Sequence, residues 1–131
     1  MAKIAAGAGA DAVSLVNTFL ALSIDTETRR PRLTNITGGL SGPAIKPITL
    51  RMVYEVAQAI DIPIIGMGGI TTPADAVEYL LAGATAVEVG TASFADPCAV
   101  ERLAKGLESW CRGHGVEKVS TLTGALEIPH N

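Results

Sequence analysis

Charged residues are scarce in this sequence. They make up 18% of its 131 residues, against about 25% in an average globular domain. The formal net charge is only −3, which gives no reason to expect a nucleic acid or an anionic membrane as a partner. Hydrophobic residues reach 48%. This length and composition are typical of one α/β domain whose parallel strands are buried on both faces.

Cysteine is also rare, and long apolar runs are missing. The two cysteines, Cys98 and Cys111, lie 13 positions apart in what we expect to be one helix. That spacing separates them by about 20 Å and excludes a disulfide between them. No spacing of Cys and His resembles a metal site, no apolar run approaches a membrane span, and residues 1–13 lack the apolar region of a signal peptide. We therefore expect a cytoplasmic protein with reduced thiols and no metal.

Three short apolar segments predict the strands of a buried sheet. Val and Ile are frequent in them, and β-branched residues favour strands. Helical periodicity fills the intervals, and Thr72-Pro73 places an N-cap before a proline at the first helical position. The strands are expected at residues 12–17, 62–67 and 85–90, and the helices at residues 48–60, 72–83 and 96–112, with a helix end before residue 10 and a short helix at residues 119–126.

The first of these helices is amphipathic. Ile48, Met52 and Val53 fall on one side of it, and we expect that side to face the sheet. A connection of about thirty residues without a helix precedes it. Residues 23–27 and 32–35 are expected to pair there as a hairpin, followed by a Gly/Pro-rich loop. Loops this long are usually functional or disordered. Because Gly38, Gly39 and Gly42 allow a close approach of the backbone, we expect this loop to contact a ligand.

The order strand, loop, helix, strand, helix, strand, helix predicts parallel strands with right-handed crossovers. A complete (β/α)₈ barrel takes about 250 residues, and this chain has roughly half of that. The expected fold class is therefore α/β: parallel βα units that form an incomplete TIM barrel with about three strands, as one partial domain at residues 1–131. Because three strands leave two open edges, we expect the chain to associate with itself or to need the missing part of a longer polypeptide.

Glycines end two of the expected strands. Gly68 and Gly69 follow the second strand, and Gly90 and Thr91 follow the third. A dinucleotide fingerprint does not fit, because the G-x-G-x-x-G spacing is broken and Glu88 lies inside its strand rather than at its tip. Backbone N–H groups at glycines, with the Thr91 hydroxyl, suit a phosphate group. The alternative is that these residues only form tight turns.

Five stretches occur in a fixed order: SLVNT, TGGLSGPAIKP, IPIIGMGGI, AGATAVEVGTA and FADP. Together they resemble the carboxy-terminal part of a class 1, type B dihydroorotate dehydrogenase, the FMN-binding catalytic subunit. The resemblance covers residues 7–112 and implies the C-terminal portion of a TIM (β/α)₈ barrel. It also implies an oxidoreductase and flavoprotein that converts dihydroorotate to orotate in pyrimidine (UMP) biosynthesis.

The resemblance implies roles for individual residues. Two loops would bind the FMN phosphate, a third would approach the ribityl and phosphate side, one apolar residue would pack at the isoalloxazine ring, and an amide and a hydroxyl would contact the substrate. The two phosphate-binding loops carry Gly68 with Gly69 and Gly90 with Thr91, and the third loop carries Gly42. The apolar residue is Val16, and the amide and the hydroxyl are those of Asn17 and Thr18. An amide and a hydroxyl can pair with the carboxylate, carbonyl and N–H groups of a pyrimidine acid.

By the same resemblance, no catalytic residue is expected within this chain. The general base of the family, a Cys or Ser, and a flavin-contacting Lys would both belong to an upstream segment. Neither Lys46 nor Cys98 nor Cys111 matches them by position, and Lys46 is expected to be solvated or structural. A positioned base contributes about 10²–10⁴-fold to a rate, so we expect this chain alone to be inactive.

Partners also follow from the resemblance. Type B enzymes pair with an iron–sulfur and FAD electron-transfer subunit, and Arg29, Arg30 and Arg32 would touch such a partner or form an ordinary polar loop. Two alternatives stay open. One is another FMN-binding or phosphate-binding TIM-barrel enzyme, and the other is a non-catalytic half-barrel that binds phosphate ligands.

Overall fold

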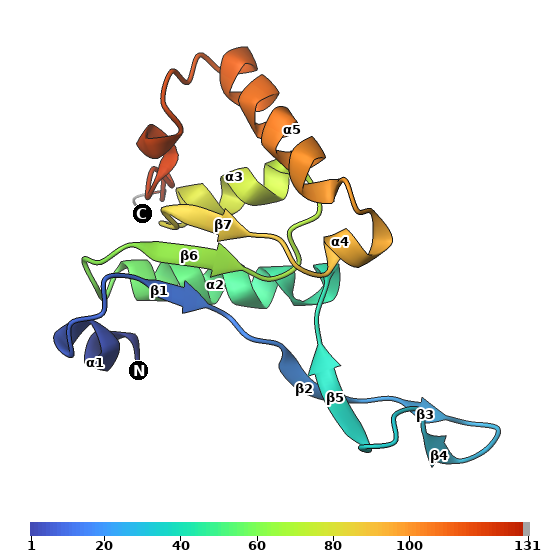
Figure 1. The fold of residues 1–131 in the computed structure, drawn as a ribbon. Coiled ribbons are helices and arrows are strands. Elements are labelled where there is room, and N and C mark those ends of the chain that lie inside the picture. Colours follow the sequence, from blue (N-terminus) through green and yellow to red (C-terminus); the bar gives the residue numbers. More distant parts are fainter. Residues whose placement is uncertain (130–131) are drawn as a thin grey trace.

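The computed structural model describes residues 1–129. Its main sheet has three parallel strands in the order β1-β6-β7 (Figure 1). The parallel direction and the three strands confirm the sequence-based expectation. The strands are β1 (Val13–Leu15), β6 (Ile64–Met67) and β7 (Ala86–Glu88), each shorter than the segment that predicts it.

Helices cover one face of this sheet. The helix α2 (Lys46–Ala57) precedes β6, α3 (Pro73–Leu81) connects β6 to β7, and α5 (Ala99–Gly113) packs against α3 (Figure 1). A Cβ on Gly106 of α5 would collide with the ring of Pro73, so the two helices approach closely at this glycine.

The hydrophobic core lies between the sheet and the helices. Tyr79 and Val53 are fully buried at its centre, and Val13 and Leu15 pack against it from β1. This packing follows from the alternation along each strand, which sends every second side chain to the helical layer. The buried members of the core are Val53, Ile64, Ile70, Ala76, Tyr79, Ala82, Ala84 and Leu103.

The opposite face of the sheet carries the alternate residues of each strand. Ser14, Ile65 and Ala86 lie in one row across the three strands, and Met67 and Glu88 lie in the next. The face therefore includes a hydroxyl and a carboxylate, and Ser14, Ala86 and Glu88 are exposed, so, contrary to the expectation, the strands are not buried on both faces within residues 1–129. No helix of residues 1–129 covers this face (Figure 1).

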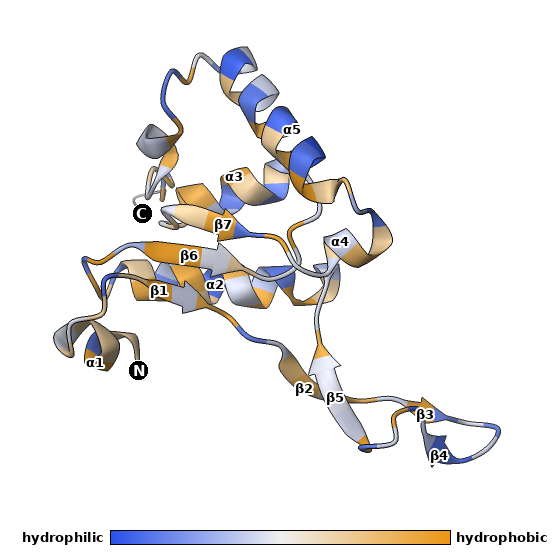
Figure 2. Cartoon of the chain, viewed as in Figure 1, coloured by the Kyte–Doolittle hydropathy of each residue, from blue (hydrophilic) through white to orange (hydrophobic). Residues whose placement is uncertain are grey.

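An arm, residues 19–40, protrudes from the sheet (Figure 1). In it, β2 (Phe19–Leu22) pairs antiparallel with β5 (Thr37–Leu40), and β3 (Ile24–Asp25) pairs antiparallel with β4 (Arg30–Pro31). Figure 2 shows that β2 is hydrophobic although it lies in this protruding part. Leu20 on β2 is 79% exposed.

The pairing within the arm differs from the sequence-based expectation. Residues 37–40, expected in a loop, form strand β5, and the tip pairs residues 24–25 with 30–31 instead of 23–27 with 32–35. The reason is that Gly38 and Gly39 serve close packing rather than a turn. A Cβ on Gly39 would collide with the side chain of Thr18, and one on Gly38 would collide with another side chain of the arm.

Helix α2 begins at Lys46, two residues before the predicted start, and its buried side matches the expectation at Val53 but not throughout. Ile48, expected on the buried side, is 46% exposed, whereas Thr49 is completely buried. The Thr49 hydroxyl donates to the carbonyl of Lys46 at 3.0 Å, which satisfies it inside the core. Apolar periodicity could not predict a threonine at this position.

Short helical segments complete the described chain. The one before α5 lies where only a turn was expected, and the last one is shorter than the predicted terminal helix. None of the helices in residues 1–129 combines the length and hydrophobicity that are needed to span a bilayer. The segments are α1 (Ala2–Gly7), η1 (Pro43–Ile45), α4 (Ala92–Ala95) and η2 (Val119–Leu122).

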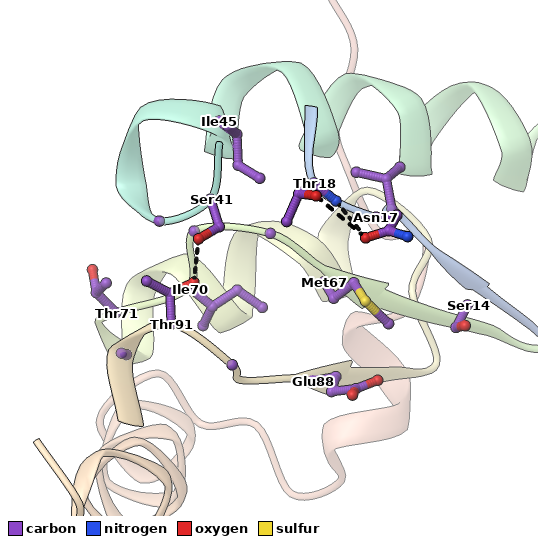
Figure 3. Close-up of a pocket in the computed structure, with 16 residues that line it drawn as sticks. Ser14, Asn17, Thr18, Ser41, Ile45, Met67, Ile70, Thr71, Glu88 and Thr91 are labelled. Carbon is purple, nitrogen blue, oxygen red and sulfur yellow. Dashed lines mark hydrogen bonds between the residues drawn. The ribbon is translucent and has the colours of Figure 1, made fainter. Parts of the chain in front are cut away.

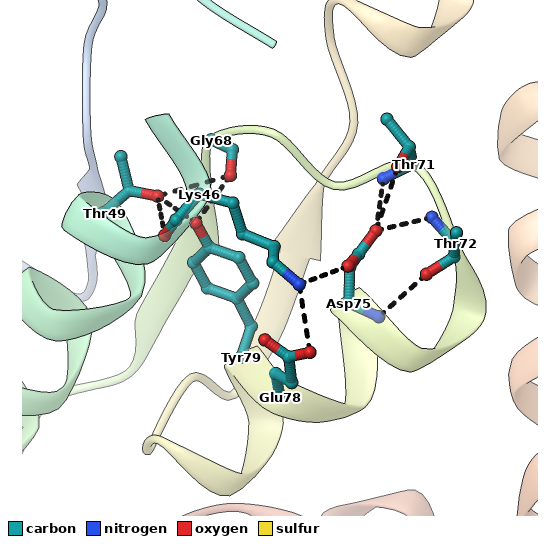
Figure 4. A network of polar contacts seen from close by, with 8 residues as sticks. All are labelled: Lys46, Thr49, Gly68, Thr71, Thr72, Asp75, Glu78 and Tyr79. Carbon is teal, nitrogen blue, oxygen red and sulfur yellow. Dashed lines mark hydrogen bonds and ion pairs between the residues drawn. The ribbon is translucent and has the colours of Figure 1, made fainter. Parts of the chain in front are cut away.

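Lys46 and Asp75 join the first turns of α2 and α3 (Figure 4). Lys46 Nζ donates to Asp75 Oδ1 at 2.6 Å and to Glu78 Oε1 at 3.0 Å. The other oxygen of Asp75 accepts the backbone N–H groups of Thr71 and Thr72 at 2.9 and 2.7 Å. The Thr72 hydroxyl in turn accepts the N–H of Asp75, which confirms Thr72 as N-cap of α3. One carboxylate thus ties two helices and a loop together.

The pKa shifts of Asp75 and Lys46 both favour the charged form of the group. Burial raises the pKa of Asp75, but the hydrogen bonds from Lys46, Thr71 and Thr72 outweigh it and hold the pKa well below its usual range. The hydrogen bond to Asp75 raises the pKa of Lys46. Because the carboxyl group has a lower pKa in the folded chain than in the unfolded chain, its contribution to stability is present above about pH 4 and is lost as the pH falls below that value.

We predict that Asp75→Asn lowers the free energy of unfolding by about 2–3 kcal/mol at neutral pH, because it removes charge-assisted hydrogen bonds from a mostly buried group. The difference from wild type should shrink below about pH 4, where the unfolded chain takes up a proton. Urea denaturation across this pH range measures it. Glu101→Gln breaks the exposed pair with Lys105 and, as the control, should change stability by less than about 0.5 kcal/mol. A difference that is independent of pH would contradict this account.

The open edges and uncovered face of the sheet lead to a second prediction. At micromolar concentration the chain should associate with itself, because β1 and β7 each leave one edge unpaired within residues 1–129 and unpaired edges favour strand addition. Sedimentation velocity over a dilution series measures this association. A compact monomer at every concentration would contradict it.

Candidate functional site

Three loops meet beyond the carboxyl ends of the parallel strands (Figure 3). They surround a cavity of about 370 Å³, a volume in the range of small-molecule sites, about 300–1,000 Å³. The segment that follows the arm, residues 41–45, forms the first loop, and the segments after β6 and β7 form the second and the third. The lining residues are Ser14, Val16, Asn17, Thr18, Ser41, Gly42, Ile45, Met67, Gly68, Gly69, Ile70, Thr71, Glu88, Gly90, Thr91 and Ala92.

The structure brings every site residue suggested by the sequence to this one cavity. Before folding, these residues are spread over four segments of the chain. They are Val16, Asn17, Thr18, Gly42, Gly68, Gly69, Gly90 and Thr91. Their individual roles stay predictions.

Gly69 lies where the first and second loops touch. It has a φ of +72°, in the region that favours glycine, and a Cβ there would lie 2.7 Å from the Gly42 carbonyl oxygen and 3.0 Å from the Lys46 Cβ. A larger residue would therefore push the two loops apart. The glycine lets the loop after β6 pass directly against the start of α2.

Gly68 is fixed from behind by two buried hydroxyl groups (Figure 4). Its carbonyl oxygen accepts from Tyr79 Oη at 2.7 Å and from Thr49 Oγ1 at 3.3 Å, and the two hydroxyls also bond to each other. Both side chains are completely buried. Burial raises the pKa of Tyr79, so its hydroxyl stays protonated as a donor.

A hydrogen bond between two hydroxyl groups connects the third loop to the first loop (Figure 3). Thr91 Oγ1 donates to Ser41 Oγ at 2.9 Å. Next to it, a Cβ built on Gly90 would meet no atom within 4 Å. Within residues 1–129, no packing contact therefore requires glycine at this position, and the space beside it is open to a ligand.

Asn17 and Thr18 follow directly after β1, at the other end of the cavity (Figure 3). Asn17 Oδ1 accepts the backbone N–H of Thr18 at 2.7 Å. This bond uses the carbonyl side of the Asn17 amide, which leaves the NH₂ group as a donor. Both side chains are exposed, and Val16 before them is half-buried.

Sequence reasoning missed several lining residues. Glu88, Met67 and Ser14 point from the open face of the sheet, as the alternation along each strand would have indicated. Ser41 lies next to Gly42 in the same loop, and a hydroxyl beside a predicted ligand-binding glycine could have indicated it as a lining residue.

Other polar candidates lie away from the cavity. Lys46 is held in its ion pair with Asp75, which agrees with the expected structural role. Cys98 is exposed, Cys111 is buried, and both are free thiols that line no part of the site. Within residues 1–129, no group of three His, Cys, Asp or Glu side chains is placed to hold a metal ion.

Comparison with known proteins agrees with these motifs. The family model of dihydroorotate dehydrogenase matches residues 1–110. The chain is 58% identical over 127 residues to the dihydroorotate dehydrogenase B (NAD(+)) catalytic subunit of Pelobacter propionicus, and 55% identical over 131 residues to that of Porphyromonas gingivalis. These matches cover 97% and 100% of this chain but only 42% and 43% of the relatives. The chain thus spans less than half of their length.

Solved structures agree with the sequence relatives. Ligand-free DHODH of Eimeria tenella matches with a TM-score of 0.77 at 30% identity, over 98% of this chain and 36% of that protein. The same enzyme in complex with ferulenol matches with a TM-score of 0.78. The three parallel βα units are therefore an incomplete portion of a TIM barrel, and the chain belongs to the dihydroorotate dehydrogenase family.

Proposed function

We propose that this chain supplies the phosphate-binding side and part of the substrate-binding side of the FMN site of a cytoplasmic dihydroorotate dehydrogenase, which oxidises dihydroorotate to orotate in pyrimidine biosynthesis. One observation carries the proposal: the residues that the resemblance assigns to FMN and substrate, from four segments of the chain, all line one cavity. Because the chain spans 42% of a curated relative, the complete reaction belongs to the chain together with the rest of the barrel.

The residues present fit a phosphate group. Gly69 and Gly90 bring backbone to the cavity surface without side chains, and Ser41, which accepts the Thr91 hydroxyl, keeps its own hydroxyl proton as a donor beside them. The space where a Cβ of Gly90 would stand is open. Backbone N–H groups and hydroxyls of this kind bind phosphate oxygens.

The other end of the cavity fits the flavin ring and the substrate. Val16 offers an apolar contact to a ring, and the NH₂ group of Asn17 offers a donor to a carboxylate or carbonyl of a pyrimidine acid. The Thr18 hydroxyl offers a second polar contact. When bound, FMN supplies the acceptor for the hydride of dihydroorotate. The chain's own residues orient the two molecules, which a hydride transfer requires.

Proton abstraction is assigned to the rest of the barrel. Lys46 is charged and held by Asp75, so it is no base, and neither cysteine reaches the cavity. Glu88 lines the cavity, but by resemblance the base is a Cys or Ser from an upstream loop.

A partner subunit is also part of the proposal. The matched relatives are named catalytic subunits, a name that implies another subunit. We assign to it an iron–sulfur and FAD protein that passes electrons to NAD. Arg29, Arg30 and Arg32 are exposed at the tip of the arm and suit a contact with an acidic partner surface.

We predict that the purified 131-residue chain has no measurable dihydroorotate dehydrogenase activity, because a missing base costs about 10²–10⁴-fold. Co-expression with the N-terminal part of the Pelobacter propionicus relative, up to the point where the match begins, should restore activity. Orotate formation with an artificial electron acceptor measures both. Turnover by the chain alone at the rate of a full-length relative would contradict the prediction.

We further predict that Gly90→Ala weakens FMN binding at least tenfold while it changes stability by less than about 0.5 kcal/mol. The added methyl group meets no protein atom, so any loss reports crowding of the ligand. Quenching of flavin fluorescence measures the affinity in the reconstituted assembly. Gly113→Ala is the matched control, since a Cβ there also meets nothing within 4 Å and lies on α5 away from the cavity. Equal FMN affinity in both variants would contradict the phosphate assignment at Gly90.

A further inference from the structure

The hydroxyl pair behind Gly68 is built to hold one carbonyl group. Tyr79 Oη lies 2.7 Å and Thr49 Oγ1 3.3 Å from the Gly68 oxygen, and Thr49 also bonds to the carbonyl of Lys46 at 3.0 Å. Each hydroxyl has one proton, so the pair cannot donate along all four contacts at once. When Tyr79 donates to the Gly68 carbonyl, Thr49 shares its single proton among the Lys46 carbonyl, the Gly68 carbonyl and Tyr79 Oη. Both side chains are completely buried, so removing one hydroxyl takes away a buried hydrogen-bond donor.

The direction of this carbonyl sets the direction of the next N–H group. In a trans peptide the C=O and the following N–H point in opposite directions. The Gly68 oxygen points back to α2 and α3 (Figure 4), so the N–H of Gly69 points away from these helices. Gly69 itself lines the cavity.

Nothing in the local backbone fixes this orientation. The peptide joins two glycines, with φ of +130° at Gly68 and +72° at Gly69, and glycine adopts many alternative conformations at little cost. A reversed peptide would aim the carbonyl oxygen at a bound anion instead of the N–H. The tertiary hydrogen bonds therefore determine whether the Gly69 N–H group or the Gly68 carbonyl faces the cavity.

The loop has few other backbone donors to offer. The N–H groups of Thr71 and Thr72 are already taken by Asp75 at 2.9 and 2.7 Å. Within residues 1–129, the N–H groups of Gly69 and Ile70 form no hydrogen bond. Of these two free N–H groups, that of Gly69 takes its direction from the Gly68–Gly69 peptide, so part of the loop's capacity to bind a phosphate depends on the orientation of this peptide.

We propose that Thr49 and Tyr79 are positioning residues for the phosphate group of the flavin: by holding the Gly68 carbonyl, they turn the Gly69 N–H toward the phosphate. Neither residue touches the ligand itself. This inference rests on the proposed function, because it assumes that a flavin phosphate occupies the loop. Its specific consequence is that the two hydroxyls affect the phosphate of FMN and leave the rest of the flavin unaffected.

The test compares FMN with riboflavin, which lacks the phosphate. In the reconstituted assembly, both flavins are titrated by fluorescence quenching into the wild type, Tyr79→Phe and Thr49→Val. Each variant should lower the affinity for FMN about tenfold and leave that for riboflavin unchanged, so the preference for FMN falls. Tyr54→Phe is the matched control, a half-buried tyrosine on α2 that lines no part of the site, and should keep the wild-type preference.

The outcomes separate this inference from the proposed function. Equal loss of affinity for both flavins in Tyr79→Phe would mean a merely structural role and overturn the positioning role. A wild type that binds FMN no better than riboflavin would overturn the phosphate site itself, and the inference with it. If Tyr79→Phe does not fold, Thr49→Val and Thr49→Ser decide the matter: the serine keeps the hydroxyl and should restore the preference for FMN, and a serine variant no better than the valine would count against the proposal.

Discussion

Lys46 reaches from the first turn of α2 to the carboxylate of Asp75 on α3, and the loop between β6 and α3 is bonded to the same carboxylate. The same carboxylate binds the N–H groups of Thr71 and Thr72, while the carbonyl of Gly68 is bonded at the other end of the loop. These contacts fix the loop from the side away from the cavity. The side that faces the cavity is formed by glycine backbone, which can adopt many conformations. The site therefore depends on polar groups that never reach it.

The chain forms one side of a site and does not enclose it. The uncovered face of the sheet combines Ser14 and Glu88 with Ile65 and Met67, a mixture that suits the interior of a barrel closed by further strands better than a surface in water. The exposed leucines of the arm, such as Leu20 at 79% and Leu22 at 52% exposure, are likewise unusual for a free surface. Both features agree with a family in which this segment forms 42% of a relative.

The parts of the fold that sequence predicts well depend on short-range patterns. Apolar strands, N-caps and the glycines at strand ends are visible within a few residues, and the rule that parallel strands end at one edge then brings Gly68 and Gly90 together. The resemblance added Asn17 and Gly42, whose place no local pattern gives. Thr49 and Tyr79 were out of reach, because they meet across 30 positions of sequence and only the packing of α2 on α3 shows it. The pairing of β2 with β5 was missed for the same reason, since Gly38 and Gly39 resemble loop residues until their partner is known.

Phosphate sites in α/β proteins often use the first turn of a helix, where free N–H groups and the helix dipole favour an anion. In this chain the start of α3 already has an anion of its own, because Asp75 accepts the N–H groups of Thr71 and Thr72, which precede the helix, and pairs with Lys46. A second anion at that position would compete with a carboxylate that is better placed and covalently attached. The remaining donors on this side of the cavity precede the helix, at Gly69 and Ile70. The Gly68 carbonyl sets the direction of the Gly69 N–H group. Because the carboxylate of Asp75 occupies the N–H groups just before α3, the orientation of the Gly68–Gly69 peptide and the hydroxyls that hold it become important for the ligand.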